Sequence, residues 1–265
     1  MSAADRYART FARLATERRG AFIPFVMLGD PDAVRSLAVV RSLAAAGADA
    51  LELGLPFSDP IADGPVIQAA ATRALAAGVR RTGCWSIVAT IRAEFPELPI
   101  GLLVYANLVC HHDPAEFYGA AATAGVDSVL VADLPVAESA TIAAAARAQG
   151  IAPVFIAPPN ADAARLRAIA AAGQGYTYVT SREGVTGADD RLRRDQSRLI
   201  AELRSLGAPP PVLGFGISNP EQVREALAMG AAGVISGSAV VKRVAAGENV
   251  VEFVRAMRAA TRQAT

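Results

Sequence analysis

The chain has 265 residues, 52% of them hydrophobic, and is therefore long enough to bury one large core. Its 26 basic and 25 acidic residues leave a formal net charge of +1, which gives no electrostatic reason to expect binding to nucleic acid or to a membrane surface. No apolar run approaches the roughly 20 residues that span a bilayer, and the Arg-rich amino terminus lacks the apolar segment of a secretory signal. We therefore expect a cytoplasmic protein.

Apolar runs of strand length alternate with Ala-rich stretches of helical periodicity along the chain. This alternation is typical of an α/β chain with a parallel sheet. We predict strands at residues 21–28, 50–54, 100–106, 128–131, 152–156, 175–180, 212–215 and 233–236. Helices are predicted at residues 31–46, 65–77, 84–95, 114–124, 137–149, 162–171, 190–206, 220–229 and 248–261, with an extra helix over 3–18 before the first strand.

The number of strand–helix units favours a closed barrel. Eight such units in about 250 residues suit the (β/α)8 TIM barrel. A doubly wound open sheet is the alternative, but it would place a Gly-rich fingerprint after its first strand, where FVMLGDP carries only Gly29. No linker, low-complexity segment or charge block divides the chain. We therefore predict one TIM-barrel domain over residues 1–265, with an additional N-terminal helix.

Two acidic residues flank a loop that follows the second predicted strand. In LELGLPFSDPIADG, Glu52 lies at the strand tip and Asp63 lies in the loop. Strand alternation directs Leu51 and Leu53 to one face and Glu52 to the other, where a core residue would be expected. Because burying an unpaired acid is costly, both acids are functional candidates, and a structural ion pair or a helix cap is the alternative role.

Glycine-bearing turns follow the last two predicted strands, as GFGIS over residues 214–218 and SGS over 236–238. TIM barrels commonly bind phosphate at the loops after strands 7 and 8, where backbone N–H groups converge and glycine lets the anion approach. One such turn is more often a simple connection. The two turns in consecutive units favour a phosphate-binding end.

Two groups that barrel enzymes commonly use as electron sinks, a Schiff-base lysine and a divalent metal ion, are disfavoured by the residues present. Lys242, the only lysine, lies beyond the final predicted strand, where an imine at the barrel centre would be hard to form. His111 and His112 are adjacent and have no nearby partners that complete a ligand set, so no metal site is predicted. Cys84 and Cys110 are expected to be reduced packing residues. A reaction that needs an electron sink would therefore have to find it in the substrate.

The segment LELGLPFSDPIADGP also belongs to a longer pattern. The other blocks of this pattern, which together span essentially the whole chain, are PFVMLGDP, GLLVYANLV, GVDSVLVADLPVAES, GYTYVTSREGVTG, GFGIS and GVISGSAVVK. In these blocks, and in their order along the chain, the protein resembles the tryptophan synthase alpha subunit. The resemblance implies retro-aldol cleavage of indole-3-glycerol phosphate to indole and glyceraldehyde 3-phosphate, within tryptophan biosynthesis. A free-standing lyase of the same chemistry and a catalytically silent docking subunit are the alternatives.

The implied substrate supplies its own electron sink, because protonating the indole ring at C3 creates an iminium-like group. In this hypothesis Glu52 donates that proton and later removes the proton of the glycerol hydroxyl, while Asp63 accepts a hydrogen bond from the indole N–H. Burial should raise the pKa of Glu52. By family position Tyr178 should lie beside this acid. Met27 occupies a place where many members of that family have threonine, so a polar contact to Asp63 or its loop is expected to be missing here.

Strand parity and the resemblance together predict the substrate site. An indole pocket is expected from Phe25, Leu103, Leu130, Ile156, Phe215 and Ile235. The resemblance implies phosphate contacts from Gly187, Gly216, Gly237 and Ser238. The Gly-containing stretch of residues 181–190 is expected to form a lid that includes Arg182 and Thr186, with an ordinary exposed loop as the alternative.

The resemblance also implies a partner and places its cofactor outside this chain. A surface that includes Pro56, Asp59, Asn107 and Pro135 is expected to dock a tryptophan synthase beta subunit. That subunit would carry pyridoxal phosphate and join the released indole to serine. The expected assembly is an alpha2beta2 heterotetramer, and no cofactor is expected in the chain itself.

Overall fold

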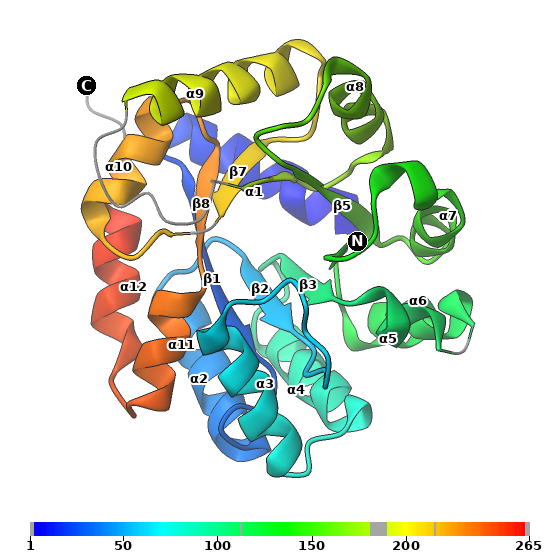
Figure 1. The fold of residues 1–265 in the computed structure, drawn as a ribbon. Coiled ribbons are helices and arrows are strands. Elements are labelled where there is room, and N and C mark those ends of the chain that lie inside the picture. Colours follow the sequence, from blue (N-terminus) through cyan, green and yellow to red (C-terminus); the bar gives the residue numbers. More distant parts are fainter. Residues whose placement is uncertain (1–2, 112, 181–189, 215, 263–265) are drawn as a thin grey trace.

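The computed structural model describes residues 3–111, 113–180, 190–214 and 216–262. Its eight parallel strands pair in sequence order, and β1 also pairs with β8, which closes the barrel. The strands are β1 (Ala21–Met27), β2 (Leu51–Gly54), β3 (Ile100–Val104), β4 (Ser128–Val131), β5 (Ala152–Ala157), β6 (Thr177–Thr180), β7 (Pro211–Gly214) and β8 (Gly233–Ser236). The predicted (β/α)8 barrel with a preceding helix is confirmed (Figure 1).

Helices surround the barrel on its outer side (Figure 1). They are α1 (Ala3–Thr16), α2 (Ala33–Ala45), α3 (Pro65–Ala76), α4 (Arg81–Glu94), α5 (Ala106–Cys110), α6 (Pro114–Ala124), the short 3-10 helix η1 (Val136–Glu138), α7 (Ala140–Ala148), α8 (Ala163–Ala172), α9 (Asp190–Ser205), α10 (Pro220–Ala228), α11 (Ser238–Ala245) and α12 (Val250–Ala259). Asp32, Asp113, Asp162 and Asn219 begin α2, α6, α8 and α10 by accepting a backbone N–H through their side chains.

Several predicted elements require correction. The strand predicted to reach residue 106 ends at Val104, and the Ala106 N–H donates to Asp133 Oδ1 at 2.7 Å, so that α5 begins there instead. The segment predicted as one helix over 137–149 is divided into η1 and α7. The valine-rich residues 238–245 form α11, which was not predicted, because Val240, Val241 and Val244 are buried against the barrel. Packing thus outweighs the low helix propensity of valine.

The strands carry apolar side chains on both faces, as expected for a parallel barrel under helices. The layer inside the barrel includes Ile23, Phe25, Ala50, Leu130, Val154, Tyr176, Val212 and Ile235. The layer between barrel and helices includes Phe22, Val26, Leu51, Leu53, Leu102, Leu213 and Val234. Leu51 and Leu53 therefore face outward while Ala50 faces inward, which confirms the parity that directs Glu52 into the barrel.

Helix α1 closes the amino-terminal end of the barrel. The ring of Tyr7 lies 5.6 Å from that of Tyr176, and its hydroxyl is 2.9 Å from Ser128 Oγ. Gly101 leaves room for this contact, because a Cβ there would lie 2.7 Å from Ser128 Oγ. Arg6 of the same helix pairs with the buried Asp127 at 2.7 Å. With this end filled, the interior is accessible from the carboxyl ends of the strands, where TIM-barrel enzymes bind substrates.

Two sequence-based expectations about the surface can be compared with the structure. None of the helices in the described parts of the chain is long and apolar enough to cross a membrane. Cys84 is buried, as expected for a packing residue, whereas Cys110 is exposed, so that expectation was wrong for the second cysteine. Cys110 lies at the end of the unpredicted helix α5, which turns its side chain away from the core.

Candidate active site

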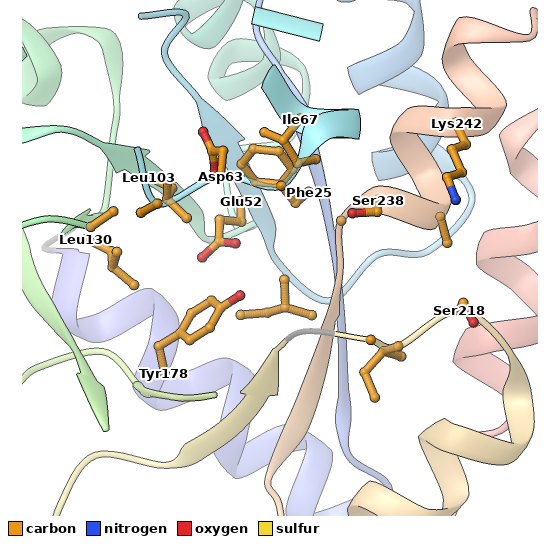
Figure 2. A pocket seen from close by; sticks show the side chains of 18 of the residues that line it. Phe25, Glu52, Asp63, Ile67, Leu103, Leu130, Tyr178, Ser218, Ser238 and Lys242 are labelled. Atoms are coloured by element: carbon orange, nitrogen blue, oxygen red, sulfur yellow. The ribbon is translucent and has the colours of Figure 1, made fainter. Parts of the chain in front are cut away.

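A cavity of about 590 Å³ opens at the carboxyl ends of the strands, and the predicted acids and Tyr178 line it together (Figure 2). Glu52 comes from β2, Asp63 from the loop after β2, and Tyr178 from β6 on the far side of the barrel. The side chains of Glu52 and Asp63 lie close together on one wall, and the hydroxyl of Tyr178 faces them (Figure 2). The two carboxyl groups therefore share one cavity.

Glu52 is a buried acid that accepts a hydrogen bond from a neutral donor. Its exposed fraction is 1%, and the Tyr176 hydroxyl donates to its Oε1 at 2.7 Å. Burial raises the pKa of Glu52 to about 7, an effect that the nearby Asp63 increases and the Tyr176 hydrogen bond opposes. The carboxyl group can therefore hold or release a proton near neutral pH, as a proton shuttle requires.

Asp63 is held by a partner that sequence reasoning missed. The Tyr105 hydroxyl donates a hydrogen bond to Asp63 and accepts the Ala62 N–H at 3.1 Å, so it joins the side chain and backbone of this loop to the end of β3. The ring of Phe57 stacks on Tyr105 with centroids 5.4 Å apart. Burial raises the pKa of Asp63, whereas the bond from Tyr105 opposes that shift.

Two tyrosines at strand β6 have different roles in the geometry. Tyr176, immediately before the strand, donates to Glu52 a hydrogen bond that the sequence did not predict. Tyr178 reaches the cavity across Gly214 of β7, where any Cβ would overlap its hydroxyl. Burial and the negative charges of Glu52 and Asp63 raise the pKa of Tyr178 well above its usual value, so its hydroxyl remains protonated. Tyr176 lies two residues before Tyr178 and so shares its strand parity, which is the signal that the sequence offered for it.

Apolar side chains form the middle of the cavity. The predicted indole-pocket residues in the described part of the chain all line it, namely Phe25, Leu103, Leu130, Ile156 and Ile235. Ile67 of α3 is a further lining residue that was not predicted. Met27 is buried and lies next to Gly54, where a Cβ would meet its sulfur at 3.0 Å, so it packs within the barrel. A flat aromatic group fits the chemistry of these walls.

The opposite end of the cavity carries the glycine-bearing turns. Gly216, Gly237 and Ser238 line it, together with Ser218 and Lys242 (Figure 2). Gly216 has a φ of 77°, which favours glycine, and its position leaves open space around the backbone. A hydrogen bond of 2.7 Å from Ser236 Oγ to the Ile217 carbonyl joins the two turns. The N-terminus of α11 follows directly, as in anion sites at helix ends.

Other predicted residues lie at the rim or outside the described parts of the chain. Phe215, Arg182, Thr186 and Gly187 fall outside the described residues. The predicted docking residues are at loops and helix α5 beyond the strand tips, where Asp59, Asn107 and Pro135 are exposed and Pro56 is half-buried. Within the described ranges no three metal-binding side chains gather into a group.

The fold and the cavity define a TIM-barrel enzyme of the acid–base class, with a carboxyl pair at one end of an apolar cavity and glycine-bearing turns at the other. Comparison with known proteins agrees with this class and narrows it. The family model for the tryptophan synthase alpha chain matches residues 11–264, and the chain belongs to that family. It is therefore a lyase that cleaves indole-3-glycerol phosphate in tryptophan biosynthesis.

Relatives match nearly the whole chain. The tryptophan synthase alpha chain of Shewanella amazonensis is 56% identical over 97% of this chain and 100% of its own length. That of Pectobacterium atrosepticum is 55% identical over 97% of this chain and 99% of its own.

Solved structures show the same architecture. Tryptophan synthase of Mycobacterium tuberculosis is similar with a TM-score of 0.89 and 28% identity, over 98% of this chain and 99% of the matched one. A chain from the tryptophan synthase a2b2 complex of Pyrococcus furiosus is similar with a TM-score of 0.81 and 36% identity, over 90% of this chain and 96% of that one.

Proposed function

We propose that Glu52 moves the proton in the cleavage of indole-3-glycerol phosphate, while Asp63 accepts the hydrogen bond of the indole N–H. The observation that carries this assignment is that both carboxyl groups face one apolar cavity, and that burial brings the pKa of Glu52 to about 7. Asp63 is only half-buried in its loop, so the desolvation cost of its ionised form is smaller than that of Glu52. The two acids therefore suit different tasks in one reaction.

The first step is protonation of the indole ring at C3 by the neutral form of Glu52. The ring becomes an iminium-like cation, whose positive charge is stabilised by the Asp63 carboxylate at the N–H. This ring then accepts the electron pair of the bond between C3 and the glycerol chain. The chain's own residues thus need to supply only a proton and a negative charge.

The second step returns the proton to the enzyme. As the carbon–carbon bond breaks, the ionised Glu52 takes the proton of the adjacent glycerol hydroxyl, and an aldehyde forms on the glycerol phosphate fragment. Indole leaves with its aromatic ring restored, and Glu52 is protonated again. Tyr176 holds the Glu52 carboxyl in place through both steps by its 2.7 Å hydrogen bond, and Tyr178 remains a protonated neighbour.

The other end of the cavity is assigned to the substrate phosphate. Gly216, Gly237 and Ser238 line this end of the cavity and offer backbone N–H groups, and Ser238 adds a hydroxyl. Gly187 belongs to the same proposal on the resemblance, as does a lid containing Arg182 and Thr186. With the phosphate anchored at one end, the indole ring extends over the apolar residues toward Glu52 and Asp63.

A beta subunit is the proposed partner, and the chain is proposed to act as one domain in the cytoplasm. The rim beside the carboxyl pair exposes an apolar side chain, Ile61, which is 80% accessible, next to Pro56 and Asp59. Asn107 and Pro135 continue this surface. The tryptophan synthase complex of Pyrococcus furiosus, which carries both subunit types, supports an alpha2beta2 assembly. Pyridoxal phosphate is assigned to the beta subunit, which would join indole to serine.

The partner and the reaction are tested together by measuring indole release from indole-3-glycerol phosphate, with and without an added bacterial beta subunit. We expect slow release by the chain alone and a stimulation of at least about tenfold on complex formation, because docking beside the Asp63 loop favours its ordered state. Asn107→Arg should weaken the stimulation. Arg255→Gln, a surface change at the amino-terminal end of the barrel, serves as the matched control.

Two results would contradict the proposal. Full activity without the beta subunit and no stimulation by it would support a free-standing lyase instead. Absence of indole release under both conditions would contradict the residue roles assigned here.

A further inference from the structure

The distribution of basic residues singles out one position on the cavity wall. Of the 26 basic residues, Lys242 is the only lysine, and every other one is arginine. Lys242 lies in α11, directly after the β8 turn, and lines the cavity at the end that holds Ser218 and Ser238. In Figure 2 its amine points toward the space between these two serines.

The neighbouring cation is already engaged elsewhere. Arg243 also lines the cavity, but its Nη1 donates to the Ala239 carbonyl at 2.8 Å. Its guanidinium carbon lies 4.0 Å from the centroid of the Phe253 ring. Its Nε is 3.9 Å from the carboxylate of Glu248. These contacts hold the Arg243 side chain along α11 and toward α12, so its charge is partly neutralised before any ligand binds.

Lys242 has no comparable partner in the described parts of the chain. Its side chain is exposed, and no hydrogen bond or ion pair with another described residue engages its amine. It lies four residues after Ser238 in the same helix, so the two side chains share one helix face. The hydroxyl of Ser238, the first N–H groups of α11 and the Lys242 ammonium therefore converge on one volume.

We propose that Lys242 binds the substrate phosphate directly and contributes a full positive charge to it from α11. This inference rests on the function proposed above, which places the phosphate at this end. Backbone N–H groups carry partial charges, whereas a phosphate monoester has a charge close to −2 near neutral pH. An ammonium on a flexible four-carbon stem adds a full charge and can follow the phosphate as it settles.

The position of Lys242 predicts a specific kinetic signature. The phosphate does not react, so its charge is the same in the bound substrate and in the transition state. Loss of the ammonium should therefore weaken binding uniformly, which raises KM and leaves kcat nearly unchanged. For Lys242→Met we expect a rise in KM of about tenfold, as for an exposed charge-assisted hydrogen bond. Lys242→Arg keeps the charge and should recover most of the loss.

Because the chain has one lysine, the contact can be observed without substitution. Reductive methylation with 13C-formaldehyde labels the Lys242 amine and the amino-terminal amine, and preserves the charge of both. NMR spectra of the labelled full chain are then recorded during titration with inorganic phosphate and with glycerol 3-phosphate. We expect a saturable shift of the Lys242 signal, while the amino-terminal signal serves as an internal reference.

The kinetic experiment uses the complex with an added beta subunit, and Arg255→Met is the control that removes one positive charge from the opposite end of the barrel. An unchanged KM in Lys242→Met, with normal indole release by the unsubstituted chain, overturns the Lys242 inference and leaves the proposed function intact. A Lys242 signal that does not shift when glycerol 3-phosphate inhibits the enzyme overturns it as well. Absence of indole release by the unsubstituted chain would instead contradict the proposed function.

Discussion

The two ends of the cavity solve different physical problems. At the end of the cavity that holds Glu52 and Asp63, the key group is the Glu52 side chain, which is 1% exposed and held by a hydrogen bond from the buried Tyr176. At the other end, the expected ligands are backbone groups and side chains that are open to solvent, such as Ser218, Ser238 and Lys242. Proton transfer needs a pKa shifted by burial, whereas a dianion is captured from water by groups that are already accessible.

This difference separates the effects that substitutions should have. Substitutions at the end that holds Glu52 and Asp63 alter the group that gives and takes the proton and the group that stabilises the ring cation, so they should lower kcat. Changes at the open end affect a group that keeps its charge throughout, so they should raise KM. The Lys242 experiment examines the second half of this comparison, and the following substitutions examine the first.

Glu52→Gln should have the largest effect. The amide cannot donate or accept the transferred proton, and we expect kcat to fall by roughly a hundredfold to ten-thousandfold, with KM changed little. Steady-state indole release in the complex measures this, and Glu94→Gln, an exposed acid paired with Arg41, is the matched control. A rate within a few-fold of the unsubstituted enzyme would remove Glu52 from the chemistry. If KM instead rose by a hundredfold or more while kcat stayed unchanged, Glu52 would have a role in substrate binding and not in proton transfer.

Tyr176→Phe should have a smaller effect of a different kind. The Tyr176 hydroxyl stabilises ionised Glu52, so its removal should raise the pKa of Glu52 above its value of about 7. Because the reaction begins from protonated Glu52, activity should decline as pH rises through this pKa, and the decline should move to higher pH in the variant. We also expect kcat to fall by about tenfold, because the carboxyl group is less firmly oriented.

The pH profile of kcat/KM measures this shift. Tyr118→Phe, a buried tyrosine of the outer layer, controls for the loss of a buried hydroxyl. A profile in Tyr176→Phe that coincides with that of the unsubstituted enzyme would mean that the hydrogen bond does not influence the titration of Glu52.

Much of this site follows from the local sequence pattern. The parity of residues 50–53 placed Glu52 inside the barrel, and the Gly/Pro-broken loop placed Asp63 at its mouth, because both depend on a few consecutive residues. The alternation along the other strands, together with the family resemblance, identified the apolar residues of the cavity wall. The turns after the last two strands were also readable, since glycine at those positions reflects backbone geometry.

The parts that escaped prediction depend on contacts between distant segments. The partnership of Tyr176 with Glu52 joins residues 124 positions apart, and it is set by how β2 and β6 face each other across the closed barrel. The bond from Tyr105 to Asp63 depends on the exact course of a loop. Helix α11 forms from valine-rich residues because burial against β1 and α3 outweighs their local preference.

The most direct test of the central claim is the titration of Glu52 itself. A chain labelled with 13C at its glutamate carboxyl groups would be followed by NMR across the pH range, and the Glu52 signal identified by its absence in Glu52→Gln. The cavity geometry predicts a midpoint of about 7 for this signal. A midpoint near the ordinary value of 4.5 would contradict the account, because Glu52 would then be ionised at neutral pH and unable to donate the proton that begins the cleavage.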